Sequence, residues 1–94
     1  MEAKEVNEKL KESCIEAVAA IDKLKSDDFD KTRSKIEWCV GSYDNDQNPV
    51  GLHESCTEVL ALFLEFKKSN PRKIAKKVID NIEKSIKEYE ALNA

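Results

Sequence analysis

The chain is poor in the residues that form tight turns. Its 94 residues include only 2 glycines and 2 prolines, so a fold built from many short strands and turns is not expected. No apolar run approaches the roughly 18 residues that a membrane span requires. The first residues are charged and show no apolar stretch of the kind found in signal peptides. The length predicts one domain, residues 1–94, and these absences predict a cytoplasmic protein without membrane contact.

Cysteine and histidine are also scarce, with 3 Cys and 1 His. A secreted disulfide domain normally pairs its cysteines, so we expect Cys14, Cys39 and Cys56 to be free thiols in an apolar core. These thiols and His53 could supply four zinc ligands, but no CxxC pair is present. A ferritin-like di-iron site is excluded, because it requires two Glu-x-x-His motifs. We expect no metal and no cofactor.

Apolar residues recur at steps of three and four along most of the chain, which is typical of amphipathic helices. We expect four helices, over residues 3–25, 27–43, 52–68 and 71–92. Short loops between them favour an all-α, antiparallel up-down-up-down four-helix bundle. The expected core stripe consists of Ala3, Val6, Leu10, Cys14, Ala17, Ile21, Leu24, Phe29, Thr32, Ile36, Cys39, Val40, Tyr43, Leu52, Cys56, Val59, Leu60, Phe63, Phe66, Ile74, Val78, Ile82, Ile86 and Tyr89.

Capping residues set the expected helix boundaries. Ser26 is a good N-cap and precedes an acidic first turn, so the second helix should begin at Asp27. Asn70 is a strong N-cap and Pro71 fits the first helical position, so the fourth helix should begin at Pro71. Residues 44–51 combine Asx side chains, a proline and a glycine, which predicts the one clear loop.

This loop resembles an EF-hand calcium loop at its start. Asp44, Asp46 and Asn48 occupy the first, third and fifth ligand positions. The resemblance fails at the sixth position, where Pro49 replaces glycine, and at the twelfth, where Ser55 replaces the bidentate glutamate. An Asx-rich turn is the favoured interpretation. Weak calcium binding in the loop 44–55 remains an alternative.

A second signalling alternative is histidine phosphotransfer. A single histidine on a four-helix bundle resembles such domains in architecture alone, and His53 would be the residue that accepts the phosphoryl group. Its neighbours in residues 52–55 lack the small side chains and the lysine that these domains use. No nucleophile, base and orienting group occur together elsewhere, so we do not expect an enzyme.

Charge is distributed unevenly along the chain. The formal net charge is −3, and residues 1–66 hold 8 basic and 15 acidic side chains. Residues 67–77 hold six cations and no acid: Lys67, Lys68, Arg72, Lys73, Lys76 and Lys77. Cations at the start of a helix oppose its dipole, so stability alone does not explain those expected in the fourth helix.

This basic segment has three interpretations. We rank a solvated helix face, or pairing with acidic side chains of the same chain, first. A dock for an acidic protein partner is second and a phosphate or nucleic-acid contact third. The acidity of the whole chain argues against nucleic acid. The segment also contains no aromatic residue on which bases could stack.

Among the apolar residues outside the expected core stripe, four are candidates for an interface: Ile15, Trp38, Leu62 and Leu64. Any one of them could pack at the flank of the core or simply be exposed. Together they predict an interface, since exposed apolar area marks interaction sites and Trp is a favoured anchor. The simplest partner is a second copy of the chain. The sequence therefore predicts a non-enzymatic bundle that acts through protein–protein interaction, as a homodimer or an adaptor.

Overall fold

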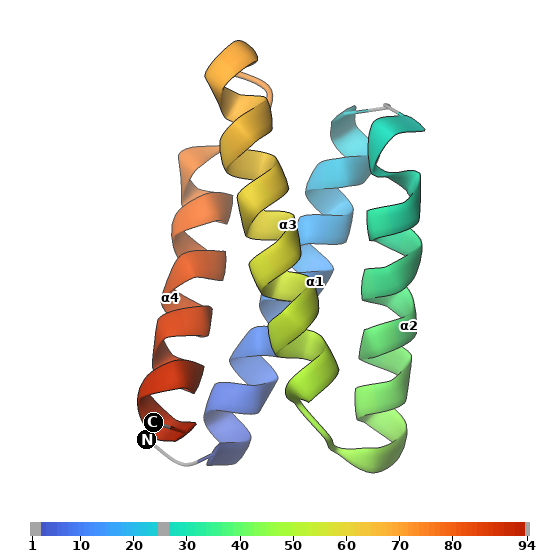
Figure 1. The fold of residues 1–94 in the computed structure, drawn as a ribbon, viewed down its shortest axis with the longest axis vertical. Helices are drawn as coiled ribbons and strands as arrows, with labels where there is room; N and C mark the ends of the chain where they lie inside the picture. Colours follow the sequence, from blue (N-terminus) through green and yellow to red (C-terminus); the bar gives the residue numbers. More distant parts are fainter. Residues whose placement is uncertain (1–2, 25–26, 94) are drawn as a thin grey trace.

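The computed structural model describes residues 3–24 and 27–93 and contains four α-helices that run alternately up and down (Figure 1). The helices are α1 (Ala3–Leu24), α2 (Asp30–Asp46), α3 (Val50–Ser69) and α4 (Lys76–Asn93). A 3₁₀ turn, η1 (Asp27–Phe29), leads into α2. The described part of the chain holds no strand. The expected four-helix bundle is confirmed, and none of these helices is long and apolar enough to cross a membrane.

One face of each helix forms the core. The buried apolar residues are Val6, Leu10, Cys14, Ala17, Ile21, Phe29, Ile36, Cys39, Tyr43, Leu52, Cys56, Val59, Phe63, Ile74, Ile79, Ile82 and Ile86. All but Ile79 belong to the expected stripe, so the periodicity located the core correctly. Ile79 is buried and Val78 half-buried, because these neighbours flank the centre of the same face. Ala3 is exposed, and the other expected positions are half-buried at the edge of the core.

The fourth helix begins at Lys76, so the expected start at Pro71 is wrong. Asn70 ends α3 instead of capping α4, because its backbone N–H and its side-chain amide both donate to the carbonyl oxygen of Phe66, at 3.0 and 3.3 Å. Residues 71–75 form an irregular turn. The first bonds of α4 reach back to the carbonyl of Ala75. Arg72 therefore lies outside the helix.

The loop between α2 and α3 is shorter than the expected segment 44–51. Helix α2 continues to Asp46, and Gln47 closes it in a left-handed conformation with φ of 60°. The Asp46 carboxylate accepts the N–H of Asn48 at 2.9 Å, and the side chain of Asn48 accepts the N–H of Val50 at 3.1 Å. These Asx turns replace a calcium-type loop. The expected N-cap Ser26 lies outside the described residues.

Candidate functional site

A groove of about 310 Å³ lies between the end of α1 and the start of α4. Its apolar lining is formed by Ala19, Ala20, Ile74, Ala75 and Val78. Its polar lining is formed by Glu16, Lys23, Lys73, Lys77 and Asn81. We call this site the basic groove. The first turn of α1 and the last turn of α4 lie at the opposite end of the bundle (Figure 1).

The local sequence explains why a hollow forms here. Ala19 and Ala20 give α1 small side chains where it faces the start of α4. The irregular turn is held against the core by Ile74, which is only 2% exposed. This anchor leaves Lys73 and Ala75, on either side of it, exposed along the groove. The basic groove therefore depends on the irregular turn that replaces the expected first turn of the fourth helix.

The three lysines of the basic groove outnumber its single carboxylate. Among the described residues, no carboxylate forms an ion pair with Lys23, Lys73 or Lys77. The one acid of the lining, Glu16, accepts a hydrogen bond from the side chain of Asn81 at 3.3 Å. The N-terminus of α4 adds the partial positive charge of its free N–H groups. The electrostatic field in the groove therefore favours an anion.

Only part of the predicted basic segment meets at this site. Lys67 and Lys68 lie in the last turn of α3, where cations complement the helix dipole, and Lys68 also pairs with Glu65 at 3.3 Å. Arg72 and Lys76 are exposed but do not line the groove. Lys73 and Lys77 do, together with Lys23 from α1. Sequence reasoning missed Lys23, because no local signal links it to residues about fifty positions away.

The four off-stripe apolar residues are exposed, as expected. Their exposed fractions are 51% for Ile15, 73% for Trp38, 39% for Leu62 and 45% for Leu64. They are distributed over α1, α2 and α3. Leu62 and Leu64 stand about 200° apart around α3, at 100° per residue. Self-association through all four at once would therefore need several faces of the bundle.

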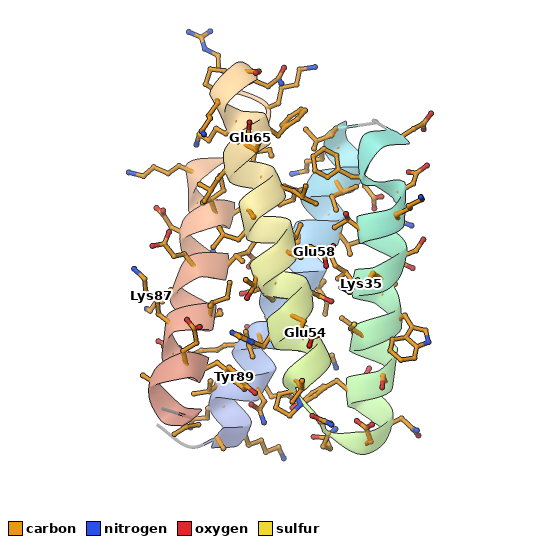
Figure 2. All side chains as sticks on the ribbon, viewed as in Figure 1. Lys35, Glu54, Glu58, Glu65, Lys87 and Tyr89 are labelled. Carbon is orange, nitrogen blue, oxygen red and sulfur yellow. The ribbon has the colours of Figure 1, made fainter. Side chains whose placement is uncertain are left out.

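Contacts of other α3 residues show on which side of this helix Leu62 and Leu64 lie. Glu58 reaches Lys35 of α2 at 2.6 Å (Figure 2). By helical position Leu62 lies on this side, one turn further along. His53 marks the other side, where it stacks on Tyr89 of α4. Leu64 lies on the same side of α3 as His53, because the two residues are about three helical turns apart.

His53 acts as a packing residue between α3 and α4. Its ring stacks on Tyr89 with centroids 4.7 Å apart, and Nε2 lies 3.5 Å from a carboxylate oxygen of Glu90. Nε2 is shielded from solvent. A carboxylate beside this nitrogen repels an incoming phosphoryl group, so the geometry does not favour phosphoryl relay through it. A relay would have to use the other ring nitrogen.

The residues weighed as possible zinc or calcium ligands form no metal cluster among the described residues. Cys14, Cys39 and Cys56 are buried free thiols, as expected. Asp44 is helical and pairs with Lys11 at 2.6 Å. Across residues 3–24 and 27–93, no three His, Cys, Asp or Glu side chains form a cluster that could hold a metal ion.

The basic groove combines two kinds of recognition. Its apolar lining can release water against an apolar side chain, and its lysines can pair with carboxylates or phosphates. The residues that line it include no cysteine, serine or histidine that could act as a nucleophile or base. A groove with this lining is chemically suited to an amphipathic anion. Comparison of the chain with family models, with curated proteins and with solved structures gives no match.

Proposed function

We propose that the protein is a non-enzymatic binding domain whose basic groove docks an acidic, amphipathic segment of a protein partner. One observation carries this proposal. Lysines without an ion-pair partner among the described residues, Lys73 and Lys77, lie beside the apolar side chains of Ile74 and Val78 in a single groove. A merely solvated helix face needs no such apolar lining.

The size of the groove limits what it accepts. At about 310 Å³ it lies at the lower end of ligand pockets, which span roughly 300–1,000 Å³. It therefore fits a few apolar side chains of a peptide better than a whole cofactor. Exposed ion pairs contribute only about 0.2–1 kcal/mol each. The lysines then set orientation and association rate more than affinity, and binding should weaken as salt rises.

A peptide titration tests the proposal. The probe is a synthetic helical peptide with leucines on one face and glutamates beside them, added to ¹⁵N-labelled protein. We expect the largest amide shifts at Ala20, Ala75 and Val78, which line the groove. Shifts spread evenly over the four helices would contradict the proposal.

Matched charge reversals separate the groove from net charge. The double substitution Lys73→Glu and Lys77→Glu should weaken peptide binding by roughly tenfold, because it removes two ion pairs and adds charge repulsion. The control is Lys4→Glu with Lys31→Glu, which changes the net charge equally at two exposed lysines outside the groove. Equal loss in both variants would show that only overall charge matters, and the proposal would fail.

Self-association is a second candidate function. The observation that favours it is Trp38, the most exposed large apolar side chain among the described residues, at 73%. Because Leu62 and Leu64 lie on opposite sides of α3, one interface cannot hold both, and a dimer centred on Trp38 is the simplest form of this candidate. A phosphate or nucleic-acid ligand in the basic groove would appear as binding of inorganic phosphate or duplex DNA without the peptide.

A further inference from the structure

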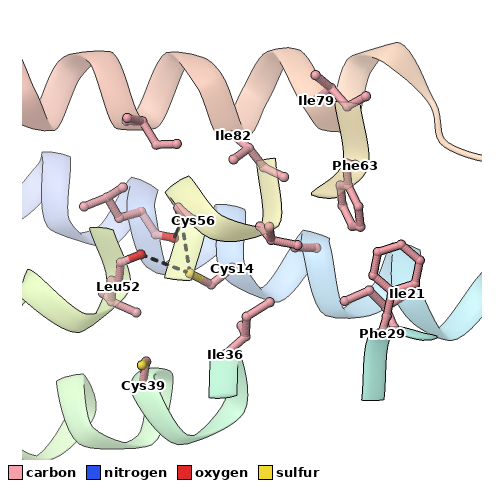
Figure 3. Close-up of a cluster of buried hydrophobic side chains, with 14 of the residues drawn as sticks. Cys14, Ile21, Phe29, Ile36, Cys39, Leu52, Cys56, Phe63, Ile79 and Ile82 are labelled. Atoms are coloured by element: carbon pink, nitrogen blue, oxygen red, sulfur yellow. Dashed lines mark hydrogen bonds between the residues drawn. The ribbon is translucent and has the colours of Figure 1, made fainter. Parts of the chain in front are cut away.

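Two of the three cysteines meet in the centre of the bundle. The sulfur atoms of Cys14 on α1 and Cys56 on α3 lie 3.0 Å apart, and both residues are fully buried (Figure 3). The Cys14 thiol also lies 3.8 Å from the carbonyl oxygen of Leu52, and the Cys56 thiol 3.6 Å from that of Leu10. Each thiol is therefore directed across the interface between α1 and α3.

The third cysteine has a different partner. The sulfur of Cys39 accepts a hydrogen bond from the hydroxyl of Ser55 at 3.1 Å. No contact of Cys39 with another thiol occurs among the described residues. The odd cysteine number thus divides into one facing pair and one separate thiol, although wide spacing in the sequence gave no sign of a pair.

We propose that Cys14 and Cys56 form a two-cysteine redox site, which a hydroperoxide converts into an intramolecular disulfide while Cys39 remains a thiol. A disulfide has its sulfurs about 2.05 Å apart, so the two atoms must approach by only about 1 Å. They lie 42 positions apart in the sequence, on helices that no single loop connects. The bond would therefore fix α1 to α3 across the bundle.

The chemistry balances with the hydroperoxide as the two-electron oxidant. One cysteine sulfur attacks the peroxide oxygen, the O–O bond breaks, and a sulfenic acid and an alcohol form, or water when the oxidant is hydrogen peroxide. The alcohol keeps the proton that the thiol loses. The second sulfur then attacks the sulfenic sulfur, the S–OH bond breaks, and water leaves with the second thiol proton.

Burial makes the first step slow in the closed bundle. The hydrogen bond with Cys56 and the loss of hydration both raise the pKa of Cys14, so its unreactive thiol form dominates there. Attack by peroxide needs a local opening between α1 and α3. The sulfenic acid, once formed, has the second sulfur beside it. Disulfide formation should therefore be faster than further oxidation to sulfinic acid.

Mass spectrometry of the folded wild-type chain tests the site. Reduced protein is treated with excess hydrogen peroxide, and its remaining thiols are then alkylated. We expect a mass loss of about 2 Da before alkylation and one alkylated cysteine instead of three. Trypsin leaves Cys39 and Cys56 in one peptide, so cleavage after Glu37 and Glu54 with a glutamate-specific protease is needed to assign the link.

The variants provide the matched controls. Cys39→Ser should keep the mass loss, and both Cys14→Ser and Cys56→Ser should abolish it. A link that includes Cys39, a disulfide between two chains, or sulfinic and sulfonic acids in place of the bond would each overturn the proposal. If a core variant does not fold, the peptide map of the wild-type chain still decides.

Discussion

The hydroxyl oxygens of Ser13 and Ser85 lie 2.7 Å apart where α1 packs against α4, and both residues are buried. Each hydroxyl also has a carbonyl within reach on the opposite helix, from Asn81 and from Lys9, both at 3.4 Å. Small side chains let the two helices approach closely. The pair therefore satisfies two buried polar groups and favours one register of α1 against α4.

A double-mutant cycle should detect the coupling of these hydroxyls. We expect Ser13→Ala to lower the free energy of unfolding by about 1 kcal/mol, because it removes a buried hydrogen bond while a carbonyl remains for Ser85. Ser85→Ala should have a similar effect. The double variant should lose less than the two single losses combined. Urea unfolding measures all three, and strictly additive losses would show that the two serines do not interact.

Helical periodicity explains why so much of the fold could be predicted. Residues such as Leu10, Ile36 and Leu52 recur at spacings that only a helix places on one face, and each is fully buried. Ser13 and Ser85 are buried on the same faces but were not predicted. A hydroxyl reads as polar in a sequence, and its burial depends on a partner seventy-two positions away.

Helix ends and the candidate site were harder to predict, because they depend on competing local bonds. Asn70 is a good N-cap by type, yet its side chain bonds backwards to Phe66 and ends α3. Lys73 and Lys77 stood out in the sequence as cations, but the groove they line also needs Lys23 from a distant helix. The exposure of Trp38 could be predicted from its position in the helix. Which residues surround it on the surface could not be predicted.

Alkaline pH should destabilise the bundle through two buried groups. The hydrogen bond with Cys56 and burial raise the pKa of Cys14 above its ordinary 9.0. Burial and the nearby negative charge of Glu8 raise the pKa of Tyr43 above 10.0. Well below pH 9 both groups hold their protons in folded and unfolded chains alike, so they add no pH dependence there. Above it the unfolded chain loses protons that the folded chain keeps, and stability falls.

The slope of this loss can be measured directly. Each such group contributes about 1.4 kcal/mol per pH unit once only the unfolded chain ionises. Urea unfolding with a reducing agent, at about pH 8 and about pH 10, should show a smaller loss in Cys14→Ala than in Cys39→Ala. Tyr43→Phe should flatten the curve at the most alkaline values. Identical slopes in all variants would mean that other groups control the alkaline limit.

Trp38 should control any self-association of the chain. Because its indole is the more exposed of the two side chains and Trp is a favoured anchor, a dimer should depend on Trp38 more than on Ile15. Light scattering of the wild type should then give about twice the monomer mass of 10.7 kDa at high concentration. Trp38→Ala should shift the mass to that of the monomer, and Ile15→Ala should not. A monomer at every concentration would eliminate the dimer.

Lys77 and Lys68 should respond to charge reversal with opposite signs. Lys77 lies in the first turn of α4 and Lys68 in the last turn of α3. An acid at a helix N-terminus is favourable by about 0.3–1 kcal/mol, whereas an acid at the C-terminus is unfavourable. Lys77→Glu should therefore raise the thermal midpoint, and Lys68→Glu should lower it, also because it loses its pair with Glu65.

The same two variants separate stability from binding at the basic groove. Lys77 lines the groove and Lys68 does not. Lys77→Glu should therefore give a more stable protein that binds the acidic peptide less well, measured by thermal unfolding and by titration of the same sample. Lys68→Glu should give a less stable protein with unchanged affinity. If Lys77→Glu left peptide binding intact, this lysine would be only part of a solvated surface. Its charge would then neither stabilise α4 nor contribute to ligand binding.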